Sequence, residues 1–219
     1  MASVSPNPVP FSEPPYLRGL PSPYYTDGHR QFQKACRQFL WENLLQYAVE
    51  WEKQGTVPDH VFDTFCKYNM LIPNLPAPLP VDWLKRLGIH QILTVKVEDW
   101  DYLHTGIYCD EVRTLCPARG QERERELTLQ LARSGSTGPG TSLNAGFAFG
   151  IPPIIKFGSR ALQERFLPDL LTGRKRACIA ITEPEAGSDV ANITTTATRS
   201  ADGRHYIING TKKWCYQSL

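Results

Sequence analysis

The chain has 219 residues, of which 41% are hydrophobic and 21% charged, proportions that are typical of a folded globular protein. Its 24 lysines and arginines nearly balance 22 aspartates and glutamates, so the formal net charge is +2, far from the basic excess of a dedicated nucleic-acid binder. No apolar run reaches the length of about 18 residues that a membrane-spanning helix needs. The first 25 residues show neither a secretory signal nor a mitochondrial presequence pattern.

Residues 1–25 are rich in proline and are expected to form an extended tail. A strong helix is predicted next, capped by Thr26 or Asp27 and ended by Gly55. Its apolar residues recur at steps of three and four, which places them on one face: Phe32, Cys36, Phe39, Leu40, Leu44, Tyr47 and Trp51. Pro58 suits the first residue of a second helix, which is predicted to end near Asn69.

The prolines from Pro73 to Pro80 forbid regular structure in that stretch. A further helix is predicted over residues 98–111, with Trp100 and Ile107 on its apolar face. Residues 112–130 then change character, because proline and glycine break the helix and an alternating Glu/Arg run follows. Removal of these residues would join a clean helix to a glycine loop, so we interpret 112–130 as an insertion, with a retained intron as the hypothesis.

Residues 134–142 are predicted to be a loop, and residues 143–157 a buried helix interrupted by Pro152 and Pro153. Ser159 is a predicted N-cap of a short helix that ends near Gly173. Beyond residue 175 the pattern becomes that of strands.

A short apolar strand is predicted over Cys178–Thr182, and residues 194–199 and 205–208 flank the turn signal Asp202–Gly203 of a β-hairpin. The predicted fold class is therefore α+β, an all-helical part followed by the beginning of a β part.

The stretch Ile179–Val190 reads IAITEPEAGSDV and forms a glycine- and serine-containing loop at a predicted strand end, which suits a phosphate or a flavin edge. It resembles the acyl-CoA dehydrogenase signature, roughly (A/L)-x-T-E-P-x-A-G-S-D. The match continues downstream through Thr194–Ala197 and Tyr206–Trp214, and upstream through Leu171–Gly173. So many ordered residues are far more specific than a short glycine motif.

The resemblance implies an FAD flavoprotein of fatty acid metabolism, an oxidoreductase that oxidises the Cα–Cβ bond of acyl-CoA thioesters. A carboxylate base removes the α proton while the β hydride passes to flavin N5. By the same resemblance, residues 26–174 are the helical N-terminal domain and residues 175–219 the start of a small antiparallel β-barrel domain, with FAD bound between the two.

Residue by residue, the family's motif places the flavin against Ile179, Ile181 and Thr182, the pyrophosphate at Gly187 and Ser188, and Trp214 against the isoalloxazine. Ser188 would also contact the substrate. Glu185 departs from the family, which has a small residue there; we expect its charge to face solvent.

The family's catalytic glutamate belongs to a C-terminal helical bundle, so no catalytic residue is expected among these 219 and the chain is interpreted as an inactive fragment. Two alternatives stay open: a non-catalytic flavin- or acyl-CoA-binding remnant, and a helical interaction module that uses its proline-rich tail. A yellow purified protein, with flavin absorbance, would favour the enzyme or the binding remnant over the interaction module.

The implied partners are acyl-CoA, an electron acceptor that is either an electron-transfer flavoprotein or oxygen, and further copies of the full-length protein in a homo-oligomer. Six dispersed cysteines without a CxxC pair, and five histidines without ligand spacing, give no metal site. Free thiols in a reducing compartment are expected. The protein is therefore predicted to be intracellular, with cytoplasm, mitochondrion and peroxisome left open.

Overall fold

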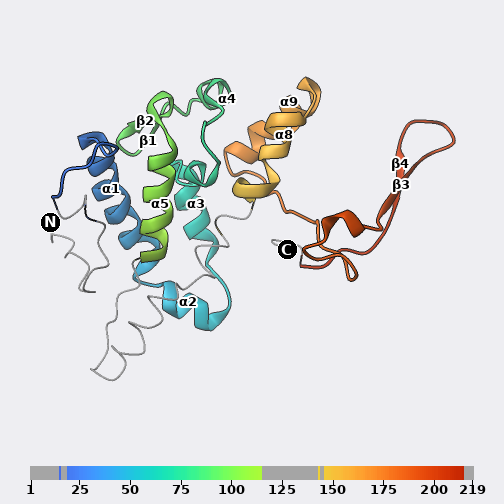
Figure 1. Ribbon diagram of the computed structural model, residues 1–219, viewed down its shortest axis with the longest axis horizontal. Helices are drawn as coiled ribbons and strands as arrows, with labels where there is room; N and C mark the ends of the chain where they lie inside the picture. The colour runs from blue at the N-terminus through green and yellow to red at the C-terminus, as the bar shows by residue number, and fades with distance from the viewer. Residues whose placement is uncertain (1–14, 16–18, 115–142, 144–145, 215–219) are drawn as a thin grey trace.

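The computed structural model describes residues 15, 19–114, 143 and 146–214, which Figure 1 draws in colour. Helices form the first part of the chain and a hairpin of strands the last, which confirms the predicted α+β class. The α-helices are α1 (Asp27–Leu40), α2 (Ala48–Gln54), α3 (Asp59–Lys67), α4 (Val81–Arg86), α5 (Tyr102–Thr114), α8 (Pro152–Phe157) and α9 (Arg160–Leu171).

The described strands form two antiparallel pairs, and they do not close into a barrel. In the helical part β1 (Gln91–Ile92) pairs with β2 (Val95–Lys96), and in the last part β3 (Thr196–Arg199) pairs with β4 (Tyr206–Asn209). None of the helices in the described part of the chain has both the length and the hydropathy that crossing a bilayer requires.

The first predicted helix is divided by one π-helical turn. Helix α1 follows Thr26 and runs into η2 (Trp41–Leu45), after which α2 continues to Gly55. A π turn holds more residues than an α turn, so it rotates the apolar face. Trp51 is therefore buried, whereas Tyr47 is 46% exposed, and the predicted face was wrong for Tyr47 alone.

The second predicted helix is α3, which has Pro58 at its N-cap and ends just before Asn69, a residue in the left-handed region with φ 59°. The stretch that follows is more ordered than its prolines suggest. It contains a 3₁₀ turn, η3 (Ile72–Asn74), and α4 begins directly after Pro80. Alternate residues of the stretch are buried in the core: Leu75, Ala77 and Leu79.

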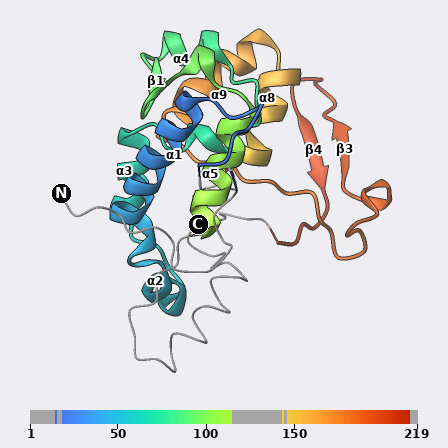
Figure 2. The same ribbon diagram turned by 60° about the vertical axis from the view of Figure 1, so that its left-hand side comes forward.

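The core of the helical part lies where α1 packs against α5, which run side by side in Figures 1 and 2. Phe32 and Cys36 of α1 and Ile107 of α5 are almost fully buried. Helix α5 starts later than predicted, so Trp100 precedes it, yet its ring still meets the Phe32 ring edge-on at 5.1 Å. Tertiary packing thus keeps Trp100 in the core outside any helix.

Helix α5 extends to Thr114, three residues into the segment 112–130 that we interpret as an insertion. The remainder of that segment, and the predicted loop 134–142, lie outside the described residues. The insertion therefore stays a prediction.

Pro152 and Pro153 were predicted to interrupt a helix. Instead they form the first turn of α8. The first turn of a helix tolerates proline because its N–H groups have no partner within the helix. A π-helical turn, η5 (Gly146–Gly150), precedes them. The predicted N-cap Ser159 is confirmed, since its Oγ accepts from Leu162 N at 3.4 Å.

The segment that leads from α9 to the β part packs against η5 at Ala177. A Cβ on Gly146 would lie 2.6 Å from the Ala177 carbonyl oxygen, and one on Gly150 would lie 2.9 Å from the Ala177 Cβ. Only glycine allows so close an approach. These two glycines therefore set where the segment after α9 leaves the helical part.

The prediction of a strand over Cys178–Thr182 was wrong, because these residues form no strand. An apolar run becomes a strand only when a neighbour pairs with it. The predicted hairpin is confirmed, with Thr196 opposite Asn209 and Arg199 opposite Tyr206. Figures 1 and 2 show it standing away from the helices, and both of its strands are exposed along their whole length.

Candidate functional site

The signature segment folds around a tight turn. Glu183 N donates to the Ala186 carbonyl at 2.9 Å, and Ala186 N donates back to the Glu183 carbonyl at 3.2 Å. Pro184 occupies the position of a β-turn that favours the fixed φ of proline. Glu183 and Ala186 are buried while Pro184 and Glu185 are exposed, so the expectation that Glu185 faces solvent is confirmed.

The side chain of Glu183 turns inward and is surrounded by donors. Its carboxylate accepts from Thr194 N at 2.7 Å, from Thr195 N at 3.1 Å and from Lys212 Nζ at 2.8 Å. The Thr194 hydroxyl donates a further bond at 2.9 Å. These bonds, that of Lys212 foremost, hold the pKa of Glu183 far below its ordinary value, so the group is a carboxylate at neutral pH.

The segment is also tied to the chain after β4. Lys213 N donates to the Thr182 carbonyl at 2.8 Å, and Lys212 Nζ donates to the Ile181 carbonyl at 3.2 Å. Residues 181–183 and 212–213 therefore lie side by side. This places Trp214 next to the start of the signature loop, although 31 positions separate Lys212 from Ile181.

The six predicted cofactor contacts differ in exposure. Ile179 and Thr182 are half-buried, whereas Gly187 and Ser188 are exposed. Ile181 is 42% exposed and Trp214 is 74% exposed. The structure hydrogen-bonds Lys213, the residue before Trp214, to Thr182, and Gly187 and Ser188 follow the turn in the chain.

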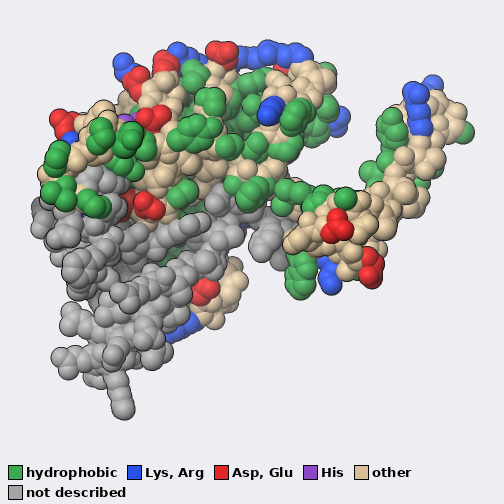
Figure 3. Space-filling view, viewed as in Figure 1, with side chains coloured by type: hydrophobic (Ala, Val, Ile, Leu, Met, Phe, Trp, Pro, Cys, Tyr) green, Lys and Arg blue, Asp and Glu red, His purple; other side chains and the backbone are tan. Residues whose placement is uncertain are grey.

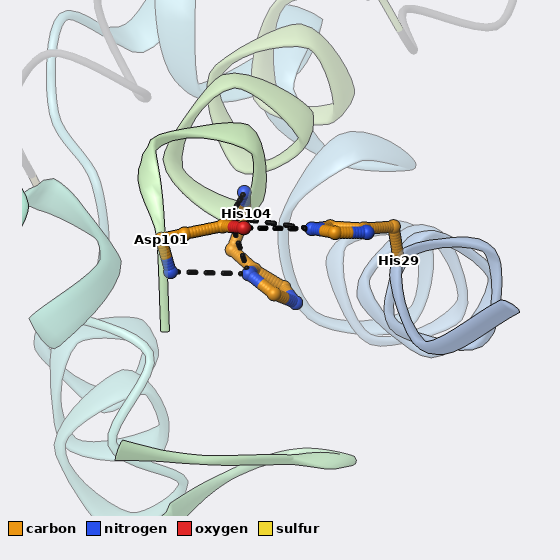
Figure 4. A group of neighbouring side chains, drawn as sticks. All are labelled: His29, Asp101 and His104. Atoms are coloured by element: carbon orange, nitrogen blue, oxygen red, sulfur yellow. Dashed lines mark hydrogen bonds and ion pairs between the residues drawn. The ribbon is translucent and has the colours of Figure 1, made fainter. Parts of the chain in front are cut away.

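A second cluster, which was not predicted from the sequence, joins the starts of α1 and α5 (Figure 4). Thr26 N donates to His29 Nδ1 at 3.0 Å, and Asp101 N lies 3.2 Å from His104 Nδ1. Each histidine is thus the third residue of a helix and reaches back to the residue that caps it. The two rings stack at 4.2 Å and both are buried.

Asp101 links the two helix starts. It accepts from the backbone N–H of Leu103 at 3.0 Å and of His104 at 3.1 Å, as an N-cap does. One of its oxygens also lies 3.1 Å from His29 Nε2. Because His29 Nδ1 accepts from the backbone, the hydrogen of the neutral ring lies on Nε2 and is donated to Asp101.

This cluster also has the composition of a cation site, since ligand atoms of His29, Asp101 and His104 lie within 4.8 Å of one another. Imidazoles that bind one tetrahedral ion through bonds of roughly 2.1 Å radiate from it, which keeps their centres about 5 Å apart. The stacked rings, at 4.2 Å, are closer than that. Helix capping accounts for all three side chains.

Neither feature was predicted in full from the sequence. Glu183 lies within the signature, but nothing in it marks Lys212 as its partner. The histidine pair has a local signal, because Thr26-x-x-His29 and Asp101-x-x-His104 follow the spacing of a capping box, with histidine where glutamate or glutamine is usual.

Comparison with known proteins defines the class. The family description "Acyl-CoA dehydrogenase, middle domain" matches residues 178–218, the segment that holds the signature turn and the hairpin. The acyl-CoA dehydrogenase apdG of Emericella nidulans is 70% identical over 214 residues, which cover 98% of this chain and 44% of that protein.

Solved structures agree in fold. The acyl-CoA dehydrogenase of Geobacillus kaustophilus superposes with a TM-score of 0.60 at 25% identity, over 89% of this chain and 41% of its own. That of Bacillus anthracis, determined in complex with FAD, superposes with a TM-score of 0.61 at 22% identity, over 91% of this chain and 28% of its own.

Residues 178–218 thus match the acyl-CoA dehydrogenase family's middle domain, and almost the whole chain is similar to proteins named acyl-CoA dehydrogenases. The chain spans less than half the length of the relatives it matches. The activity of the whole protein therefore enters below as a proposal.

Proposed function

We propose that the protein that carries this chain is an FAD-dependent oxidoreductase that introduces the α,β double bond into acyl-CoA thioesters. The observation that carries the proposal is the signature loop, whose turn is tied to the hairpin while Gly187 and Ser188 stay exposed. The 70% identity to a protein named acyl-CoA dehydrogenase supports it. FAD, when bound, supplies the redox chemistry.

The residues present fit such a cofactor. A Cβ on Gly187 would meet nothing within 4 Å, so the backbone there is open to a phosphate. Ile181 and Trp214 are apolar and exposed, as the walls of a flat ring system need to be. We propose that Ile179, Ile181 and Thr182 line the flavin and that Trp214 packs on its face.

Gly187 and Ser188 are proposed to hold the pyrophosphate, with Ser188 also reaching the substrate. Small residues with backbone N–H groups and a hydroxyl are what a phosphate requires. Figure 3 shows hydrophobic side chains gathered over α8 and along the hairpin, on the two sides of the notch between them. This placement favours a ligand held between the helical part and the β part.

No catalytic base is assigned to this chain. The buried carboxylate of the signature, Glu183, is held ionised by Lys212 and two backbone N–H groups, so it is committed to structure. Glu183 is therefore not proposed as the base that takes the α proton. We propose that the 219 residues alone do not turn over substrate.

The similarity to acyl-CoA dehydrogenases also supports the proposed domain limits, 26–174 for the helical domain and 175–219 for the β domain. A homo-oligomeric full-length form is proposed for the same reason. Cys36, Cys66 and Cys178 carry free thiols in the described part of the chain, which supports the proposed intracellular location. Either an electron-transfer flavoprotein or oxygen is proposed to accept the electrons.

Flavin binding tests the proposal. The purified protein is expected to quench the fluorescence of added FAD, and reduction of the bound flavin by an acyl-CoA is expected only where the catalytic base is also present. Oxygen uptake during turnover would identify an oxidase, and its absence a dehydrogenase that needs a protein acceptor. FAD binding without any reduction would favour the non-catalytic binding protein, and no FAD binding would contradict the proposal.

A further inference from the structure

One buried carboxylate joins three separate segments of the β part. Glu183 belongs to the signature turn, Thr194 and Thr195 precede β3, and Lys212 follows β4. Glu183 is only 3% exposed, although most residues around it in sequence are exposed. A buried carboxylate is stable only when its oxygens are satisfied, and here both accept from several donors.

Apolar packing contributes little at this place. The residues from Gly187 to Thr194 are all exposed, and so are both strands of the hairpin. A segment without a core of its own keeps its shape through its hydrogen bonds. The Glu183 carboxylate supplies most of those that link the signature turn to the hairpin.

Lys212 completes the link from the opposite side. Its ammonium group donates both to Glu183 and to the Ile181 carbonyl, so it bridges a side chain and the backbone of the proposed flavin-lining segment. Gly210 lies against the side chain of Thr195, which occupies the place that a Cβ would take. The residues that flank the two strands, Thr195 before β3 and Lys212 after β4, therefore both contact Glu183.

We propose that Glu183 and Lys212 are positioning residues that fix the loop Ile179–Ser188 against the hairpin in the shape that receives FAD. The inference rests on the proposed function. Neither residue touches the cofactor; each acts through the backbone of the loop. The carboxylate does more than neutralise the lysine, because it also accepts the N–H groups of Thr194 and Thr195, which a lysine at position 183 cannot do.

The test uses the full chain with Glu183→Gln, Glu183→Ala and Lys212→Met, and Glu185→Gln as the matched control on the exposed side of the same turn. FAD affinity is measured by fluorescence quenching, the setting of the bound flavin by visible circular dichroism, and folding of the helices by far-ultraviolet circular dichroism. Hydrogen exchange of the Thr194 and Thr195 amides is followed in protein without FAD.

Glu183→Ala is expected to weaken FAD binding at least about tenfold, since hydrogen bonds to a charged group are the strong ones. Glu183→Gln, which keeps one acceptor oxygen, is expected to weaken it less, and Glu185→Gln by less than about twofold. The helical signal should stay as in wild type. The exchanged pair Glu183→Lys with Lys212→Glu should not restore binding, because the backbone N–H groups remain without their acceptor.

Two results would overturn the inference: FAD affinity of Glu183→Ala equal to that of the Glu185→Gln control, or full rescue by the exchanged pair. Absence of FAD binding in wild type would instead contradict the proposed function. In that case hydrogen exchange of the Thr194 and Thr195 amides tests the positioning role. Faster exchange in Glu183→Ala than in Glu185→Gln supports this role, and equal exchange overturns it.

Discussion

The rings of His29 and His104 stack 4.2 Å apart with their planes 31° from parallel, although each belongs to a different helix. Both rings are buried and both reach Asp101. Burial lowers the pKa of His104, the Asp101 carboxylate opposes this shift, and the His29 ring adds to it. The joined helix starts are therefore sensitive to acid.

The first prediction concerns pH. Because the pKa of His104 is lower in the folded protein than its ordinary 6.5, the unfolded state binds more protons as pH falls below 6.5, and stability declines. The decline per pH unit for one such group is at most about 1.4 kcal/mol. His104→Gln keeps a side chain that can reach back to the cap and should flatten the decline. Urea midpoints between pH 7.5 and 5.5, with the exposed His60→Gln as control, measure this; an unchanged slope in His104→Gln would contradict it.

The second prediction concerns the cap itself. Partial burial acts to raise the pKa of Asp101, but the His104 backbone N–H and the two imidazoles hold it below the ordinary value. Asp101→Ala removes the acceptor of Leu103 N and His104 N and should cost about 1–2 kcal/mol, as loss of an N-cap does. Asp82→Ala, at an exposed position in the first turn of α4, should change the free energy of unfolding by less than about 0.5 kcal/mol. Equal effects of the two would argue against the cap.

The third prediction concerns the buried contact between α1 and α5. Arg37 donates two hydrogen bonds to Glu111, at 2.8 and 2.9 Å, and Gln33 donates a third at 2.5 Å. Glu111 is 2% exposed. Glu111→Ala removes this carboxylate from beside the largely buried guanidinium of Arg37. The free energy of unfolding should therefore fall by about 3–5 kcal/mol. The exposed pair Arg160–Glu164 is the control; Glu164→Ala should cost under about 1 kcal/mol. Chemical denaturation distinguishes the two, and similar losses would contradict the prediction.

The fourth prediction concerns the approach of Ala177 to η5. Gly146→Ala places a methyl group 2.6 Å from the Ala177 carbonyl oxygen and should cost about 1–3 kcal/mol, as other overpacked sites do. Gly106→Ala, in the exposed face of α5 with nothing within 4 Å of the new methyl, should instead stabilise the chain by up to about 1 kcal/mol. Thermal melts of both variants measure the difference, and a Gly146→Ala protein as stable as Gly106→Ala would refute the close approach.

Local sequence signals were sufficient to predict the features that depend only on residues close together in the chain. Gly55 and Ser159 end and cap helices as predicted, because caps depend on a few neighbouring residues. The turn at Asp202–Gly203 likewise produced the predicted hairpin. The signature Thr182–Asp189 indicated the resemblance to acyl-CoA dehydrogenases before any coordinates, since its residues are ordered along the chain.

Other features depended on contacts that no local pattern contains. Cys178–Thr182 is as apolar as a strand, but strands require a partner, and none pairs with it among the described residues. Helix α4 and the pair β1–β2 are too short for periodicity to mark. The π turn at Trp41–Leu45 carries no sequence signal that we recognise, and Tyr47, in the turn that follows it, leaves the apolar face.

The sequence by itself determined the resemblance to acyl-CoA dehydrogenases, the division into a helical and a β part, and the loop proposed for the cofactor. Only the tertiary structure decided that Glu183 faces Lys212 and that His29 stacks on His104. The physical reason is the same in both cases. A cap or a turn forms from residues a few positions apart, whereas these pairs join distant segments and exist only once the whole chain around them has folded.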